Sequence, residues 1–114
     1  MRIVDKNSKI SRAELKKMAE KMFGDLVKAV IDIKKEVMAV DAELHADQEQ
    51  FLLENGSKQK DLWGINLYPG ESGSEWIEFD SMINLRPSWG NRSRGVDDLK
   101  NRKKIIEIVN KLVK

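Results

Sequence analysis

Residues 43–47, with the sequence ELHAD, place three side chains of chemical interest at alternate positions. Alternate residues of an extended strand share one face, so Glu43, His45 and Asp47 would point the same way. Carboxylate and imidazole groups suit a divalent metal ion, the one cofactor that the sequence suggests. His45 is the only histidine, and its ordinary pKa is the nearest to neutrality. His45 is therefore the candidate general base or acid, with Asp80 as a second candidate. The alternative is a solvated face on which His45 bonds a neighbouring carboxylate.

A second candidate site is the arginine-rich segment RPSWGNRSRG, residues 86–95. Its forked guanidinium donors suit phosphate or carboxylate, and its tryptophan would stack on a base. The residues that would bind a ligand here are Arg86, Trp89, Asn91, Arg92 and Arg94. Asp97 and Asp98 follow at once and would repel a phosphate or pair with an arginine. The segment therefore predicts either an anion site or only the connection to the last helix.

Polar residues also interrupt two strand-like segments that precede this loop. Asn66 and Asn84 stand among apolar residues, although asparagine is depleted in strands. Together with Tyr68 they extend the predicted ligand-binding set onto the polar face of a sheet. Their hydrogen bonds would serve either the structure or a ligand.

The elements that position these residues follow from periodicity and turn chemistry. Ser11 and Glu14 form a capping box before an apolar stripe, which predicts a helix over residues 11–23. Residues 26–34 and 37–46 alternate in polarity around a polar break and predict a hairpin, after which Asp47 would cap a short helix over 48–55. Residues 62–68 and 75–85 predict a second hairpin, and residues 96–112 a final helix.

This order predicts a single α+β domain over residues 1–114. We expect an antiparallel sheet of four strands from two hairpins, or of five if residues 1–5 add an edge strand. The N-terminal and C-terminal helices would pack on one face and leave the other face wet.

Composition and charge narrow the function classes. The 114 residues include no cysteine, which excludes a disulfide framework and a thiol nucleophile. No apolar run is long enough to span a membrane and the beginning has no signal-like stretch, so we expect a cytoplasmic protein with no membrane partner. Net charge is +4 over residues 1–24, −8 over 25–85 and +6 over 86–114. We expect the ends to neutralise the middle within the monomer; a bipolar surface that steers a charged partner is the alternative.

Three segments together resemble a known family: ELHAD (43–47), GSKQKDLWGINLYP (56–69) and FDSMINLRPSWGNRS (79–93). The family consists of small, uncharacterised, single-domain bacterial proteins of unknown function. The resemblance covers most of the chain and implies a free-standing cytoplasmic protein. It implies no activity, cofactor or partner.

The residues themselves favour a binding module for an anionic ligand, either a nucleotide or RNA, at the polar sheet face and the 86–95 loop. Whether the protein is an enzyme is left open by the sequence. One alternative is a small hydrolase of the phosphodiester type, which would use His45 with nearby carboxylates. The other is a structural, homo-oligomeric interaction protein with Trp76 and Met82 in the interface.

Overall fold

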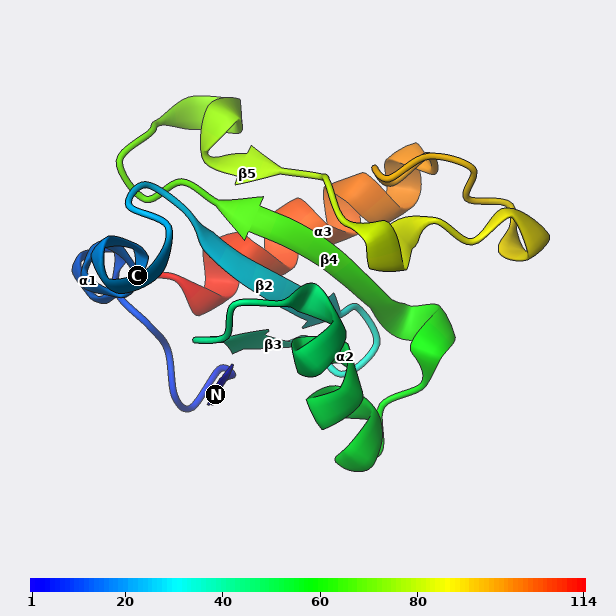
Figure 1. Ribbon diagram of the computed structural model, residues 1–114, viewed down its shortest axis with the longest axis horizontal. Helices are drawn as coiled ribbons and strands as arrows, with labels where there is room; N and C mark the ends of the chain where they lie inside the picture. Colours follow the sequence, from blue (N-terminus) through cyan, green and yellow to red (C-terminus); the bar gives the residue numbers. More distant parts are fainter.

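A computed structural model describes residues 1–114 as an α+β fold built on one five-stranded antiparallel sheet (Figure 1). The strand order is β1-β3-β2-β4-β5. The strands are β1 (Arg2–Val4), β2 (Val27–Asp32), β3 (Val37–Val40), β4 (Leu62–Leu67) and β5 (Ile77–Glu78). The helices are α1 (Arg12–Met22), α2 (His45–Glu54) and α3 (Leu99–Leu112). The expected fold class is confirmed, in its five-stranded form, in which residues from the first five add an edge strand.

Helix α1 forms where the capping box predicts it. The Ser11 hydroxyl accepts from the Glu14 backbone N–H, and the Glu14 carboxylate accepts from the Ser11 N–H at 2.8 Å. Two of the unpaired N–H groups of the first turn are thereby satisfied. Leu15 and Ala19 on the inner face are buried against the sheet.

The predicted first hairpin is also present, and a buried aspartate fixes its turn. Asp32 is 1% exposed, and its Oδ1 accepts from the backbone N–H groups of Lys34 and Lys35 at 2.9 Å each. Its Oδ2 accepts from the Ser57 hydroxyl at 2.6 Å. Three donors therefore hold the carboxylate that ends β2 and starts the turn into β3.

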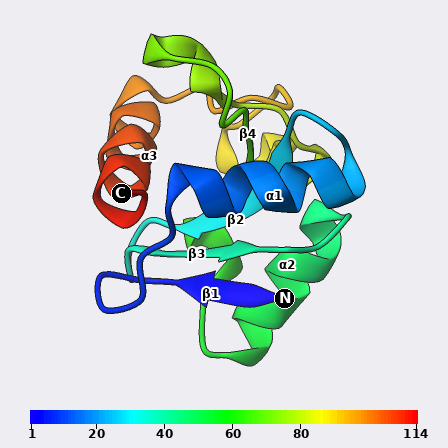
Figure 2. The same cartoon turned by 90° about the vertical axis from the view of Figure 1, so that its left-hand side faces the viewer.

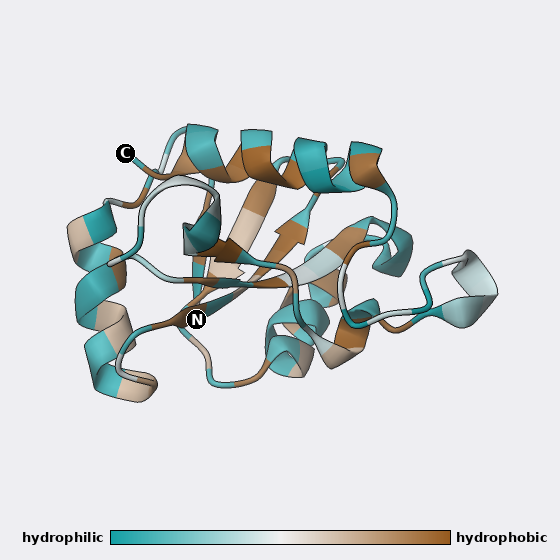
Figure 3. Cartoon of the chain, turned by 90° about the horizontal axis from the view of Figure 1, so that it is seen from above, coloured by the Kyte–Doolittle hydropathy of each residue, from teal (hydrophilic) through white to brown (hydrophobic).

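The sheet lies between two helical layers (Figures 2 and 3). Helices α1 and α3 pack on one face, as predicted, and contribute Leu15, Ile105 and Leu112 to the larger core. Helix α2 covers part of the opposite face, where Leu52 joins Val30, Ala39 and Leu62 in a smaller core. The sheet face that was expected to stay exposed to solvent is thus partly covered. Helix α2 begins earlier than the sequence indicates and packs Leu52 against this face.

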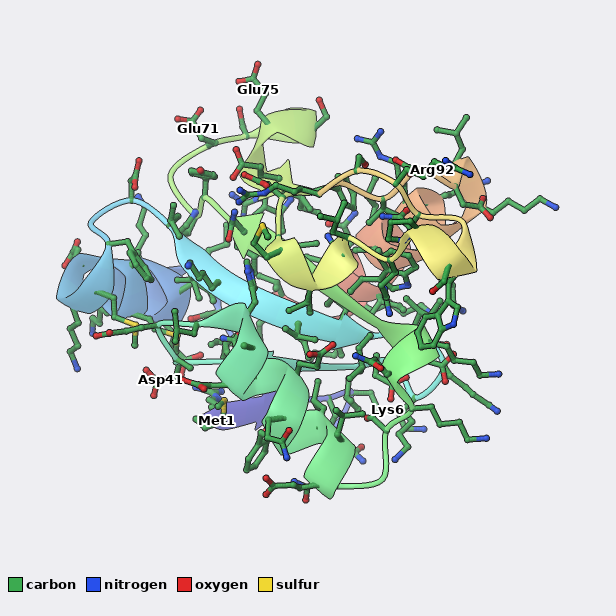
Figure 4. All side chains as sticks on the ribbon, turned by 45° about the vertical axis from the view of Figure 1, so that its right-hand side comes forward. Met1, Lys6, Asp41, Glu71, Glu75 and Arg92 are labelled. Atoms are coloured by element: carbon green, nitrogen blue, oxygen red, sulfur yellow. The ribbon has the colours of Figure 1, made fainter.

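Two strand predictions were too long. The predicted strand 37–46 ends at Val40, since Asp41 adopts a left-handed φ of 66° and turns the chain. Asp41 instead lies beside the N-terminus, with its Oδ2 3.9 Å from the Met1 amino group (Figure 4). The predicted strand 75–85 keeps only β5, and 3-10 turns occupy residues 73–76 and 82–84.

The ends of the predicted helices also shift. Helix α2 begins at His45 after Leu44, rather than after Asp47, and ends before Gly56, whose φ is 95°. Helix α3 begins at Leu99, because the Asp98 carboxylate caps it by accepting from the Lys100 N–H at 2.8 Å. No helix is long and apolar enough to cross a membrane.

Candidate functional site

A pocket of about 420 Å³ opens on the α2 face of the sheet, between the start of α2 and the segment that follows β5. We call it the His45 pocket. Its polar lining residues are Lys28, His45, Asn66, Glu78, Asp80, Ser81 and Arg94. Four of these seven were candidate site residues in the sequence: His45, Asn66, Asp80 and Arg94. The pocket therefore brings together residues from β2, α2, β4, β5 and the 86–95 loop.

The floor of the His45 pocket is a row of polar residues across three adjacent strands. Lys28 of β2 is the register partner of Asn66 of β4, which is the partner of Glu78 of β5. Neighbours in register point to the same face of a sheet. The antiparallel pairing thus places an ammonium, a carboxamide and a carboxylate side by side.

His45 forms one wall of the pocket and is held in one tautomer. Its ring is 8% exposed, and Nε2 donates to the backbone carbonyl of Ile65 at 2.7 Å. Burial lowers the pKa of His45 below its ordinary value, although the hydrogen bond to Ile65 opposes that shift. The ring is therefore neutral near pH 7, and Nδ1 remains as a hydrogen-bond acceptor.

Asn66 supplies an acceptor that nothing in the protein satisfies. Its Nδ2 donates to Glu78 Oε1 at 2.8 Å and to the Asp80 carbonyl at 3.3 Å, which fixes the orientation of the carboxamide. Its Oδ1 is buried and has no hydrogen-bond partner, and the residue is only 7% exposed. Tyr68 donates to the same Glu78 oxygen at 3.1 Å. Burial, and to a lesser extent this hydrogen bond, raises the pKa of Tyr68. Tyr68 thus bonds a residue of the pocket floor but does not line the pocket itself.

Two cationic side chains lie at the pocket, and only one of them is paired with a carboxylate. Arg94 Nε donates to Asp80 Oδ1 at 2.7 Å in an exposed ion pair. Lys28 forms no ion pair with a carboxylate, and its Nζ lies 5.1 Å from the centroid of the Phe23 ring. The Lys28 charge is therefore available to an anion in the pocket.

Two exposed apolar side chains line the same pocket. Leu44 is 54% exposed and Met82 is 63% exposed. Exposed large apolar groups beside a polar floor are typical of ligand pockets, in which a few polar groups set orientation. Lys28, Glu78 and Leu44 were not among the predicted site residues. The signal for Lys28 was its polar position in the alternating pattern of residues 26–34.

Arg86 lies outside the pocket and stabilises the structure. Its guanidinium stacks 4.2 Å from the Trp63 ring and 5.5 Å from the Trp89 ring. It donates to the carbonyls of Gln59 at 2.6 Å and Leu62 at 2.7 Å, and burial lowers its pKa. Arg86 therefore ties the 86–95 loop to the start of β4, and Trp89 lies against it rather than in the His45 pocket.

Asn84 and Asn91 also bond the protein's own backbone. Asn84 Oδ1 accepts from the Gly64 N–H at 2.8 Å, and its Nδ2 donates to the Gly64 and Arg94 carbonyls at 2.9 and 3.0 Å. Asn91 Nδ2 donates to three carbonyls, and its Oδ1 accepts from the Asp97 N–H at 2.8 Å. The hydrogen-bonding groups of both carboxamides are therefore occupied by backbone groups and hold the loop in place.

Two hydrogen-bond donors of the 86–95 loop, the Arg92 backbone N–H and the Ser93 hydroxyl, are occupied by Asp97. Its Oδ2 accepts from the Arg92 backbone N–H at 2.7 Å, and its Oδ1 accepts from the Ser93 hydroxyl. These two bonds, led by that from Ser93, lower the pKa of Asp97. The Arg92 side chain is exposed on the outer side of this loop (Figure 4). Only Arg94 of the three arginines reaches the pocket.

The ELHAD residues do not share a strand face, because the chain bends before them and His45 starts α2. Glu43 precedes the helix and Asp47 lies two residues into it, and both are exposed while His45 is buried. No group of three His, Cys, Asp or Glu side chains is placed to hold a metal ion. The predicted metal site at Glu43, His45 and Asp47 rested on a strand that the structure does not contain.

Comparison with known proteins identifies a family but does not indicate an activity. Residues 2–112 match the family described as "Protein of unknown function (DUF5674)", and the chain belongs to this family. No curated protein and no solved structure matches the chain. The family confirms the resemblance to small single-domain proteins of unknown function.

Proposed function

We propose that this member of a family of unknown function is a binding module, and that it binds a small anionic ligand of the mononucleotide class in the His45 pocket. The anion would lie against Lys28 and Arg94. The apolar or aromatic body of the ligand would lie against Leu44 and Met82.

The observation that carries this proposal is the unpartnered Oδ1 of Asn66. A buried acceptor without a hydrogen bond costs about 1–3 kcal/mol, and such groups are rare in folded proteins. The orientation of the carboxamide is fixed by the Glu78 and Asp80 acceptors, so Oδ1 cannot exchange places with Nδ2. A ligand that donates an N–H or O–H to this oxygen would remove the cost.

Charge, shape and size agree with this ligand class. The pocket offers acceptors at Asn66 and His45 and donors at Lys28 and Arg94, so it suits a molecule with both an anion and N–H groups. A volume of about 420 Å³ lies within the range of small-molecule sites. Nucleotides combine a heterocycle that bears N–H groups with a phosphate.

The layout of charge favours a small nucleotide over RNA. Helix α2 borders the pocket and carries Asp47, Glu49 and Glu54 with no lysine or arginine. Carboxylates beside the pocket repel a long phosphate backbone. The exposed aromatic residue that would stack on RNA bases, Trp89, lies against Arg86 instead.

Titration of the ¹⁵N-labelled protein with mononucleotides tests the proposal. We expect amide shifts at Lys28, Asn66 and residues 78–83, and weaker shifts with the nucleoside or with inorganic phosphate alone. Lys28→Gln should weaken binding about tenfold, the usual loss when one charged hydrogen bond is removed. Lys16→Gln on α1 removes the same charge away from the pocket and should leave binding unchanged. An absence of shifts with every mononucleotide at millimolar concentration contradicts the proposal, and tighter binding of an RNA oligonucleotide would replace its ligand.

The hydrolase alternative has one supporting observation: His45 and Asp80, the two candidate catalytic residues, line the same pocket. The neutral His45 would use Nδ1 to accept a proton from water. Incubation with a phosphodiester and analysis of the products tests it. An activity that survives His45→Gln would exclude this role for His45.

A further inference from the structure

The edge of the sheet at β5 carries an apolar groove that the proposed function does not use. The groove is about 890 Å³ and runs between β5 and α3, with Ile77, Phe79, Leu99 and Ile106 as its apolar lining. Figure 3 looks onto this edge and shows α3 running beside the sheet. Strand β5 pairs only with β4, so its outer side has no strand partner.

Two apolar residues of α3 lie outside the buried face of that helix and border the groove. Leu99 is 74% exposed and Ile106 is 38% exposed, whereas Ile105, Ile108 and Val109 are buried. Leu99 and Ile106 are seven residues apart and therefore lie on the same side of the helix. A contiguous apolar surface next to an open strand edge is typical of a protein–protein contact.

The charges along the groove are divided between its two sides. The strand side carries Glu75 and Glu78, and the helix side carries Arg102, Lys103 and Glu107, so the two sides have net charges of −2 and +1. Glu75 and Lys103 form no ion pair within the chain. The groove is therefore complementary to itself: a two-fold axis would bring the acidic side of one copy against the basic side of the other.

We propose that this groove is the interface of a symmetric homodimer. Leu99 of each copy packs between Phe79 and Ile106 of the other, and Glu75 of each copy faces Lys103 of the other. Trp76, which the sequence suggested as an interface residue, is only 4% exposed beneath the Arg12 guanidinium and belongs to the core. Met82 lines the His45 pocket and not this groove, and Glu78 is the one residue that lines both.

Light scattering after size exclusion at about 100 µM tests the proposal, because dimerisation depends on protomer concentration. We expect twice the chain mass of 13.1 kDa for the wild type. Leu99→Ser should weaken association about 100-fold, since the two-fold axis repeats a tenfold loss. Leu44→Ser removes a similarly exposed leucine outside the groove and should leave the mass at that of the dimer.

A charge exchange separates the proposed pairing from a general effect of apolar surface. Lys103→Glu and Glu75→Lys should each weaken the dimer, and the double variant should restore it. A monomeric wild type, or a dimer unchanged by Leu99→Ser, contradicts the proposal. Failure of the double variant to recover contradicts the pairing of Glu75 with Lys103.

Discussion

Asn84→Ala is the substitution whose effect can be worked out most fully from the structure. The side chain is 0% exposed and makes three hydrogen bonds, of which two join it to the backbone of Gly64. Gly64 lies in the middle of β4, beyond the residues that pair with β5. Its backbone N–H and C=O bond Asn84 at the edge where a longer β5 would continue. The Asn84 carboxamide therefore replaces a strand residue in the ladder.

The expected loss follows from the number of groups left unpaired. Asn84→Ala leaves the Gly64 N–H and the carbonyls of Gly64 and Arg94 without this partner. At about 1 kcal/mol for each hydrogen bond, the free energy of unfolding falls by about 3 kcal/mol. Unfolding entropy is about 2.1 cal/mol/K per residue, or about 0.24 kcal/mol/K for this chain, so Tm falls by about 12 °C.

Urea denaturation followed by circular dichroism measures this change directly. Asn110→Ala is the matched control, since Asn110 is exposed on α3 and has no side-chain hydrogen bond in the structure. We expect the control to change stability by less than about 0.5 kcal/mol. A loss that small for Asn84→Ala would refute the view that its carboxamide completes the sheet.

Two further predictions concern the face of the sheet that carries the His45 pocket. Gly64→Ala places a Cβ 2.5 Å from Ser81 Cβ and should cost about 2 kcal/mol of stability by denaturation, whereas Gly70→Ala, with its nearest atom 4.0 Å away, should cost little. The lowered pKa of His45 means that the unfolded chain binds the proton more readily, so the contribution of His45 to stability is present at pH 7.5 and is lost as the pH falls below about 6.5. The difference in unfolding free energy between wild type and His45→Gln should narrow from pH 7.5 to pH 5.5, and a constant difference would show that His45 is not buried as a neutral ring.

The parts of the fold that could be predicted from sequence depend on contacts between near neighbours. The capping box at Ser11 and the alternation that defines β2 act within a few residues, so their structures follow from the local sequence. The polar break after β2 was predicted for the same reason, although the buried carboxylate of Asp32 that fixes it was not.

The second half of the chain was less predictable because its conformation depends on distant partners. Residues 75–85 alternate like a strand, yet Ser81 packs where Gly64 has no Cβ, and Asn84 bonds the β4 backbone from a 3-10 turn. Nothing in residues 75–85 alone indicates either contact. The polarity pattern thus reported which residues face the core, but not the backbone conformation that brings them there.

The candidate site shows the same division. His45, Asn66, Asp80 and Arg94 could be proposed from their residue types, but their meeting in one pocket depends on the early start of α2 and on the position of the loop. The side chains of Asn84, Arg86 and Asn91, which were predicted to bind a ligand, form hydrogen bonds with the protein's own backbone. An asparagine that binds a ligand and one that bonds the protein's own backbone look the same in the sequence. Only the hydrogen-bond partners in the structure distinguish the two roles.

The sheet separates the charges of the chain rather than mixing them. Helix α3 carries five lysines or arginines and one glutamate and lies on one face with α1, while α2 carries three carboxylates on the other. Glu36 bridges to Lys104 and Lys111 at 3.3 and 3.2 Å across the hairpin end, but most of the basic layer has no such partner. The neutralisation expected within the monomer is therefore local. Because the His45 pocket opens on the acidic side, an anion there gains little from long-range attraction. The affinity of the proposed ligand would therefore depend on direct contact of its anion with Lys28 and Arg94 and of its N–H donor with the Asn66 oxygen, which favours a small ligand that fits rather than charge alone.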